Sequence, residues 1–310
     1  MNHFTELKGQ PRALHILNQY LTRPIPPLLI FAGPDGTGKY SAAEVFVRTL
    51  FCDTRSACGQ CIPCRKMLKG EHPDYIRFPA DRVKIGDRKK PEDFTIRWLI
   101  TSRLSYRPHE AEMRFVLFPD ASAIQDEAET ALLKTLEEPP EHTRFIFLVS
   151  DLQLLKPTVI SRGVIVPFQL LPRESIRELS PGIDESTLDL LGGSLENQSI
   201  ITSTLFNDLR ARVKGIHSRL DLVELEKWLI DQEKGAEKAA DKQTEPFGGM
   251  RLWELATLAW IHELAQEPEA NRRKLDALFS FKERLHNEMP GYQPYSTSLL
   301  FAALIQAEGA

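Results

Sequence analysis

Apolar residues recur along the first half of the chain in two alternating patterns. Short apolar runs with the content of buried parallel strands are separated by stretches in which apolar residues return every three or four positions, as in helices. Leu14, Leu17 and Leu21 form the first helical stretch, and we interpret Gly9 and Gln10 ahead of it as a turn. The pattern predicts an α/β fold with a parallel sheet and covering helices; its expected strands are Leu28–Ala32, Tyr75–Phe78, Arg114–Phe118, Phe145–Val149 and Val164–Phe168.

The remaining expected helices lie between and after these strands. One follows the first strand and carries Ala42, Phe46 and Leu50, and others are expected near Phe94–Arg103 and from Ile124 to Leu136. In the last third, the helical segments are Leu205–Ile230, Met250–Glu267, Ala270–His286 and Ser296–Ala307, with a polar connection at Asp231–Gly249.

A glycine-rich loop, GPDGTGKY, follows the first strand at residues 33–40. Its glycines and lysine fit the P-loop pattern, in which backbone N–H groups at a helix N-terminus hold phosphate groups. A generic strand–turn–helix connection is the alternative. The residues expected to contact ATP or ADP are Gly33, Gly36, Thr37, Gly38 and Lys39.

Two positions depart from the pattern of loops that hydrolyse ATP. Tyr40 stands where a Ser or Thr hydroxyl normally binds the magnesium ion of the nucleotide, and its phenolic oxygen lies far from its own backbone. After Arg114–Phe118, Pro119 stands at the place of the first expected acid and Asp120 at the second. We therefore expect weak or absent nucleotide binding and no ATPase turnover by this chain. Use of Ser41 or Asp120 to hold magnesium is the enzymatic alternative.

All four cysteines lie in one cluster with the spacing Cys-x5-Cys-x2-Cys-x2-Cys. Two overlapping pairs at this spacing suit tetrahedral thiolate coordination of a structural zinc ion, and four protein ligands leave no open position for a substrate. Unrelated buried cysteines and an iron–sulfur cluster are the alternatives. The expected zinc ligands are Cys52, Cys58, Cys61 and Cys64.

Composition narrows the possible classes of protein. With 310 residues and 42% hydrophobic residues, the chain is long enough for two or three domains. A net charge of −4 argues against binding nucleic acid through the overall field of the protein. The charged run at residues 82–90 is interpreted as a solvated loop, with a local nucleic-acid contact as the alternative. No apolar run reaches the roughly 18 residues of a membrane span, and no signal peptide is evident, so we expect a cytoplasmic protein without membrane contact.

Taken in order, the motifs resemble those of the bacterial clamp-loader subunits of DNA polymerase III. The resemblance rests on the glycine loop, the cysteine cluster, His72-Pro73-Asp74, the segment ALLKTLEEPP at residues 131–140, and Ser161-Arg162. It extends over residues 4–168 and, with fewer matches, over 169–203; beyond these it rests only on length and helical pattern.

This resemblance implies an AAA+ P-loop domain at residues 1–168 with an inserted zinc knuckle at about 52–64. It also implies a helical lid domain at 169–204 and an all-α collar domain at 205–310. Such subunits assemble into rings of five with gamma/tau and delta subunits, and the ring loads a sliding clamp onto primer–template DNA in replication.

Within the family, the departures point to a delta-prime-like subunit. Glu196 follows Gly193-Ser194-Leu195 at the place where active relatives carry a phosphate-sensing arginine, and an anion there repels a γ-phosphate. The resemblance makes Arg162 an arginine finger that acts on the nucleotide of a neighbouring subunit. Two alternatives remain: a gamma/tau-like subunit that hydrolyses ATP, and a zinc-stabilised interaction module unconnected to replication.

Overall fold

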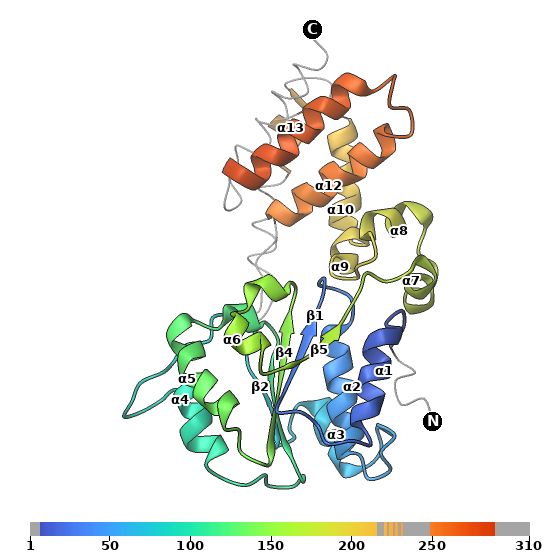
Figure 1. The fold of residues 1–310 in the computed structure, drawn as a ribbon. Helices are drawn as coiled ribbons and strands as arrows, with labels where there is room; N and C mark the ends of the chain where they lie inside the picture. The colour runs from blue at the N-terminus through green and yellow to red at the C-terminus, as the bar shows by residue number, and fades with distance from the viewer. Residues whose placement is uncertain are drawn as a thin grey trace. The chain divides into compact units, whose positions relative to one another are not determined.

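The structure is a computed structural model that describes residues 7–215, 220–221, 223–225, 227–228, 231 and 249–288 (Figure 1). The chain divides into two compact units. The first contains the residues up to Ile183 together with Gly192–Glu196, and the second contains Asp184–Leu191 and the residues from Asn197 onward. The predicted helix Ser296–Ala307 and nearly all of the predicted connection Asp231–Gly249 lie outside the described residues.

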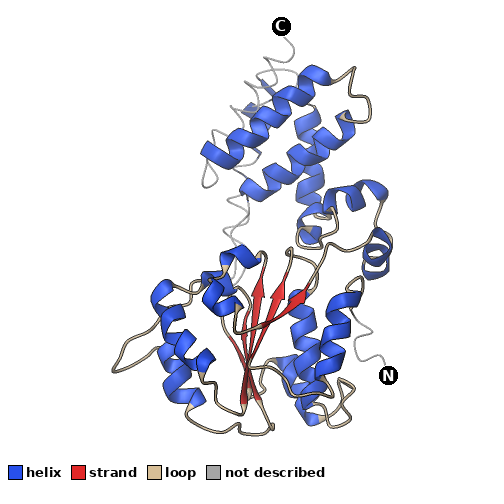
Figure 2. Ribbon diagram, in the orientation of Figure 1, coloured by secondary structure: helices blue, strands red, loops and turns tan. Residues whose placement is uncertain are grey.

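The first unit is built on a five-stranded parallel sheet, as the alternation of patterns predicted (Figure 2). Each of the four strand pairs runs parallel. In spatial order the strands are β2 (Tyr75–Arg77), β3 (Arg114–Phe118), β4 (Thr143–Val149), β1 (Leu28–Ala32) and β5 (Val164–Pro167). The expected strands are therefore confirmed to within two residues at each end.

Strand β1 lies inside the sheet and has all five side chains buried. Because side chains alternate along a strand, Leu28 and Ile30 enter the core on one face while Leu29 and Phe31 enter the core on the other. A strand covered on both faces needs a continuous apolar run, which explains why its sequence shows no polar alternation.

The Leu29–Phe31 face is covered by α1 (Pro11–Tyr20), α2 (Lys39–Phe51) and α3 (Ile62–Lys69). Figure 2 shows these three helices together on one side of the sheet. Helix α2 supplies five buried residues of this core, more than α1 or α3. The glycine loop begins at the end of buried strand β1 and ends at the start of buried helix α2, so both of its ends are held in place by the core.

The opposite face is covered by α4 (Ile96–Trp98), the π-helix η1 (Leu99–Leu104), α5 (Asp126–Glu137) and α6 (Pro157–Ile160). The helix expected near Phe94–Arg103 begins only at Ile96. Phe94 has a left-handed φ of 59°, and the Thr95 hydroxyl accepts a hydrogen bond from the backbone N–H of Trp98 at 3.4 Å. This side-chain cap fixes the helix start, which apolar periodicity alone cannot locate.

Short turns and one further helix complete the first unit, and all the described elements of the second unit are helices. The first also contains the 3₁₀ turns η2 (Ala121–Ala123) and η3 (Leu152–Leu154) and the helix α7 (Arg173–Leu179). The second contains α8 (Glu185–Leu191), α9 (Gln198–Ile201), α10 (Thr204–Lys214), α12 (Gly249–Leu264) and α13 (Arg272–Glu288). Among the described residues, no helix is both long and apolar enough to cross a membrane.

A buried ion pair organises the edge of the sheet at β2 and β3. The Asp74 carboxylate is fully buried and accepts hydrogen bonds from three successive backbone N–H groups, those of His109, Glu110 and Ala111, at 2.7 to 2.9 Å. The Arg114 guanidinium, 1% exposed, lies 3.9 Å from the same carboxylate and donates to the carbonyl oxygens of Arg103, Tyr106 and Arg107. Together the two side chains fix the loop between η1 and β3.

Replacing Asp74 by alanine is expected to lower the free energy of unfolding by about 3 kcal/mol. The change leaves the buried Arg114 charge and three N–H groups without their acceptor. Urea unfolding followed by circular dichroism measures the loss, with the exposed acid Glu71→Ala as the matched control. A loss below about 1 kcal/mol would show that this carboxylate is not a structural anchor.

Candidate functional site

The glycine loop between β1 and α2 has a positive φ at all three of its glycines, and at two of them the neighbouring backbone also leaves no room for a Cβ atom. Gly33 and Gly36 have φ angles of 147° and 67°, in the region that other residues avoid. A Cβ atom at Gly33 would lie 2.1 Å from the carbonyl oxygen of Phe168, and one at Gly36 would lie 2.1 Å from the backbone nitrogen of Glu196. The loop is therefore packed tightly against the chain just after β5 and against residues 194–196.

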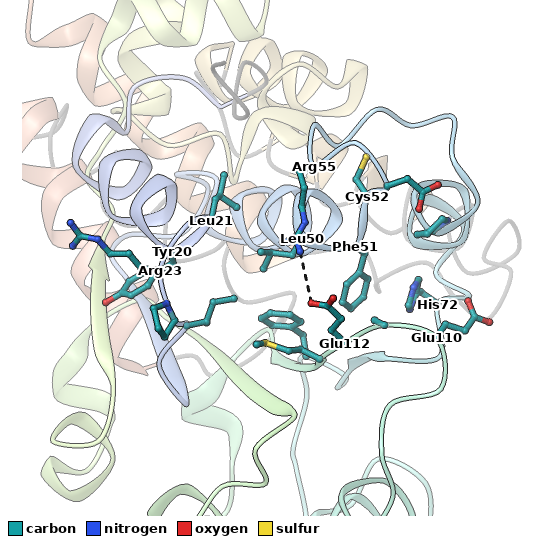
Figure 3. Close-up of a pocket in the computed structure, with 17 residues that line it drawn as sticks. Tyr20, Leu21, Arg23, Leu50, Phe51, Cys52, Arg55, His72, Glu110 and Glu112 are labelled. Carbon is teal, nitrogen blue, oxygen red and sulfur yellow. Dashed lines mark ion pairs between the residues drawn. The ribbon is translucent and has the colours of Figure 1, made fainter.

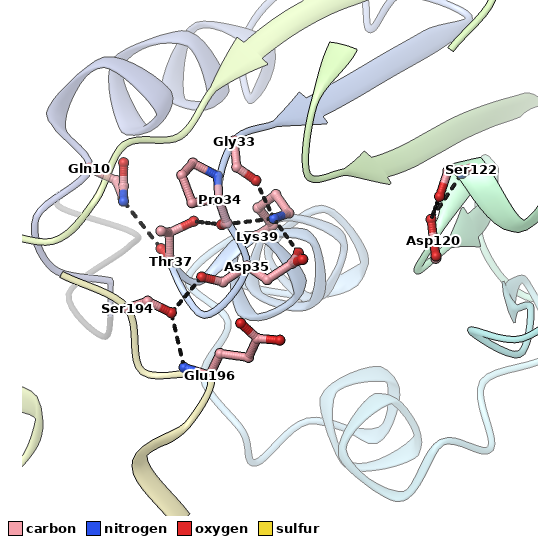
Figure 4. A network of polar contacts seen from close by, with 10 residues as sticks. All are labelled: Gln10, Gly33, Pro34, Asp35, Thr37, Lys39, Asp120, Ser122, Ser194 and Glu196. Carbon is pink, nitrogen blue, oxygen red and sulfur yellow. Dashed lines mark hydrogen bonds and ion pairs between the residues drawn. The ribbon is translucent and has the colours of Figure 1, made fainter. Parts of the chain in front are cut away.

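Lys39, the lysine of the loop, is turned toward the loop itself (Figure 4). Its ammonium group donates to the carbonyl oxygens of Gly33 at 2.5 Å and Pro34 at 2.8 Å, and to the Asp35 carboxylate at 2.9 Å. The side chain is only 7% exposed. An ammonium has three N–H donors, so all three are taken by acceptors within the loop. A phosphate group that binds this lysine must take the place of one of these three acceptors.

Residues 192–196 belong to the first unit and close over the loop. The Ser194 hydroxyl donates to the carbonyl oxygen of Asp35 at 2.7 Å, and the backbone N–H of Leu195 donates to the carbonyl oxygen of Gly36 at 2.9 Å. The backbone N–H of Glu196 in turn donates to the Ser194 hydroxyl at 3.2 Å. These bonds place an acidic residue directly beside the outer turn of the loop.

Gln10 holds the loop from the inside, a role that the sequence analysis missed. Its side-chain amide donates to the carbonyl oxygens of Thr37 at 3.2 Å and Gln169 at 2.5 Å, and its oxygen accepts from the backbone N–H of Gln169 at 3.0 Å. Gln10 is 5% exposed and immediately precedes Pro11, the first residue of α1. A polar residue beside a helix-starting proline was the available signal, but its partners lie 27 and 159 residues away.

Two residues at the expected magnesium positions are engaged elsewhere. Tyr40 is 43% exposed, and its hydroxyl accepts from the Arg77 guanidinium on β2 at 3.4 Å. The Asp120 carboxylate accepts from the backbone N–H and the hydroxyl of Ser122, at 2.9 and 2.6 Å, and so caps η2. Figure 4 shows Asp120 and Ser122 as a pair separate from the Lys39 network.

Arg162 lies just after α6 and is held at both ends of its guanidinium group. Nη1 donates to the carbonyl oxygen of Thr158 at 2.6 Å and to the Ser161 hydroxyl at 3.4 Å. Nη2 forms an ion pair with the Glu137 carboxylate at 2.6 Å. The side chain is 31% exposed, so part of it faces solvent.

The four cysteines come together at the far end of α2. Cys52 directly follows the last residue of that helix and Cys61 directly precedes the first residue of α3, and the four sulfur atoms all lie within 4.8 Å of one another. Four thiolates around one zinc ion at about 2.3 Å would stand about 3.8 Å apart, close to this arrangement. The backbone N–H groups of Cys58 and Cys61 also donate to the sulfurs of Cys52 and Cys58, at 3.5 and 3.4 Å. The cluster can therefore hold one metal ion with thiolate ligands.

The environments of these thiols differ. Burial raises the pKa of the Cys52 thiol, but hydrogen bonds from the Thr54 hydroxyl and from backbone N–H groups outweigh burial and bring this pKa down to about 5. Burial raises the pKa of the Cys64 thiol, which has no exposed surface. A bound cation would favour the thiolate form of both groups.

A cavity of about 420 Å³ lies next to the cysteine cluster (Figure 3). It is lined by side chains from the end of α1, the end of α2 and the loop before β3, and Cys52 forms part of its wall. His72 stacks on Phe51 with ring centroids 4.3 Å apart, and burial lowers the pKa of this histidine. His72 is thus a buried packing residue that favours its neutral form.

A family model described as DNA polymerase III, delta subunit, matches residues 9–172 of the chain. This segment is more than half of the chain and contains the glycine loop, the cysteine cluster and Arg162. The chain belongs to this DNA polymerase III delta subunit family.

Curated relatives include subunits with other names. The chain is 31% identical over 179 residues to DNA polymerase III subunit tau of Escherichia coli, covering 56% of this chain and 26% of that protein. It is 28% identical over 198 residues to subunit tau of Bacillus subtilis, covering 62% of this chain and 34% of that protein. The chain thus spans about a quarter to a third of the length of these relatives.

A solved structure supports the fold. A DNA polymerase III gamma subunit-related protein from Thermotoga maritima aligns over 96% of this chain and 99% of its own, with a TM-score of 0.51 and 17% sequence identity. The architecture of the described residues is therefore that of a known α/β fold.

The structure arranges the predicted site residues in three places. The loop residues Gly33–Lys39 lie at the N-terminus of α2 and the cysteines lie at its C-terminus, and a helix of this length separates them by about 20 Å. Arg162 lies apart from both, next to α5 and α6. The nucleotide loop, the metal cluster and the arginine are thus three separate features of one unit.

We expect one zinc ion per chain, bound by the four cysteines. Cys64→Ser removes a buried ligand and should abolish stoichiometric zinc, whereas Ser56→Ala, in the same loop, should keep it. Metal analysis of the purified proteins by mass spectrometry measures this. Iron in place of zinc, or full zinc content in the Cys64 variant, would refute the assignment.

Asp35→Ala is expected to raise the affinity of the chain for ATP. Removing the carboxylate frees one N–H donor of Lys39 and removes one negative charge from the loop. An ion pair with one exposed partner contributes up to about 1 kcal/mol, so the expected gain in ATP affinity is about fivefold. Equilibrium titration with a fluorescent ATP analogue in EDTA measures the affinity, with Asp53→Ala as the control outside the loop. In the double variant with Lys39→Ala, the gain in ATP affinity should disappear. An Asp35→Ala variant that binds ATP no better than wild type would contradict the view that Asp35 competes with phosphate for Lys39.

Proposed function

We propose that this chain is a delta-prime-like subunit of the clamp loader of DNA polymerase III. In this proposal it assembles with gamma/tau and delta subunits into a five-membered ring that places a sliding clamp on primer–template DNA. Family membership and the 31% identity to subunit tau support this placement in the replication machinery.

The observation that carries the proposal is the state of the glycine loop. Lys39 is satisfied by its own loop, Tyr40 is turned toward Arg77, and Asp120 caps η2. Magnesium bridges the β- and γ-phosphates and neutralises developing charge in hydrolysing proteins of this class. Since Tyr40 and Asp120 both contact other groups of the chain, we infer that the chain does not turn over ATP by itself.

Arg162 is the group through which this chain would act on catalysis. We infer that its guanidinium reaches the nucleotide of a neighbouring subunit and stabilises charge on the transferring phosphoryl group. Its position at the end of the short helix α6 and its partly exposed side chain support this role. Fingers of this kind change rates by about 10³ to 10⁵.

The other parts of the chain would serve assembly. We propose that the cysteine cluster holds structural zinc, that residues 1–168 form the AAA+ domain, and that 169–204 and 205–310 act as lid and collar. The collar residues would join the chain to the other subunits of the ring. Zinc would hold the two ends of the segment between α2 and α3 together, because Cys52 directly follows α2 and Cys61 directly precedes α3.

The competing function is a gamma/tau-like ATPase. The intact lysine at position 39 and the identity to subunit tau favour it. It requires that Lys39 exchange Asp35 for phosphate and that a magnesium ligand be recruited from Ser41 or Asp120.

The two functions differ in an assay of ATP turnover. The isolated chain is expected to show no ATPase above background. Arg162→Ala is expected to lower the DNA- and clamp-stimulated ATPase of the reconstituted complex at least about 100-fold at the affected site. Arg173→Ala, in α7, is the matched control. ATP turnover by the isolated chain that Lys39→Ala abolishes would favour the competing function. An ATPase rate of the complex that Arg162→Ala leaves unchanged would refute the proposed role of Arg162 as an arginine finger.

A further inference from the structure

Arg162 is gripped from two sides by groups of different elements. Its Nη1 is bonded to Thr158 of α6 and to Ser161, both within four residues of it in the sequence. Its Nη2 is bonded to Glu137, which lies 25 residues earlier at the end of α5. The bonds to Thr158 and Ser161 hold Nη1 alone, so the guanidinium could still rotate about that nitrogen. The Glu137 carboxylate holds Nη2 and so fixes the orientation of the group.

Glu137 stands on a rigid base. It is the last residue of α5, and that helix buries Ala128, Leu132 and Leu136 against the sheet. Pro139 and Pro140 follow within three residues and prevent the helix from continuing. The carboxylate therefore projects from a fixed point, 52% exposed, toward the arginine.

The placement of this acid is unfavourable for the helix itself. The C-terminus of a helix carries partial negative charge, so a glutamate in the last turn destabilises the helix unless a cation compensates. Arg162 is a cation that does so here. A role in stabilising α5 does not explain an acid at this position, whereas a role in holding the arginine does.

We propose that Glu137 is the positioning residue of Arg162 for hydrolysis at the neighbouring site. This inference rests on the proposed finger role of Arg162. A guanidinium has five N–H donors, and three hydrogen bonds hold it, so at least two donors remain for phosphoryl oxygens. With both terminal nitrogens anchored, the flexible arginine side chain meets the phosphoryl group with one orientation of its plane instead of many.

A second ion pair between the same elements supplies a control. Lys156, the residue before α6, lies 2.6 Å from both the Asp126 and the Glu129 carboxylates of α5. Asp126 and Glu137 are eleven residues apart, about three helical turns, and so lie on the same face of α5. Asp126→Asn weakens the bracing of α6 against α5 without touching Arg162.

The test uses the complex reconstituted with the gamma/tau-type and delta-type subunits of the same organism, and it measures steady-state ATPase against ATP concentration. Glu137→Ala is expected to lower kcat about tenfold and leave KM within about twofold, because the bound nucleotide is unchanged while the finger loses its orientation. Glu137→Gln keeps an acceptor for Nη2 and should return kcat to within about threefold of wild type. Asp126→Asn should match wild type.

Co-elution and thermal unfolding establish that each variant folds and assembles. In an Arg162→Ala background, Glu137→Ala should have no further effect, since it acts through the arginine. A kcat for Glu137→Ala within about twofold of wild type or above it, while Arg162→Ala is slow, overturns the positioning role alone. An unchanged rate in Arg162→Ala overturns the finger and this inference together.

Discussion

The Lys39 ammonium group has three hydrogens to donate and finds three acceptors in its own loop. In our account, nucleotide binding at this site depends on these three hydrogen bonds. Two acceptors are backbone carbonyls and the third is the Asp35 carboxylate. The positive charge of Lys39 and its three N–H donors are therefore satisfied by groups of the loop itself. Ser194, Leu195 and Gln10 also form hydrogen bonds to backbone carbonyl oxygens of the loop and hold it in place.

A loop of this kind serves as a structural joint. It connects β1 to α2, and α2 carries the first cysteine of the cluster at its other end. The buried Asp74–Arg114 pair fixes the loop before β3, which also lines the cavity beside the cluster. The sheet therefore holds a rigid unit in which Arg162, the proposed catalytic group, is partly exposed beside α6 with its own support from Glu137.

The sequence was sufficient to predict features that depend on local pattern. Continuous apolar runs predicted the strands, and glycine and cysteine spacing predicted the loop and the cluster. Features that depend on distant partners were not predictable in this way. Gln10, Asp74 and Glu137 each act on residues 25 or more positions away, and nothing in their immediate neighbours reveals the partner. The helix expected near Phe94–Arg103 begins two residues later, at Ile96, because the Thr95 side-chain cap determines its start.

The nucleotide loop of this chain is closed on itself, and we infer that the chain contributes to catalysis at a neighbouring site. An experimental structure of the assembled complex with magnesium, ADP and aluminium fluoride would decide between the two sites. We expect the transition-state mimic in the neighbouring site with the Arg162 guanidinium on its fluoride atoms, and Lys39 still paired with Asp35. Magnesium and nucleotide coordinated between Lys39 and Asp120 of this chain would contradict this view of the loop.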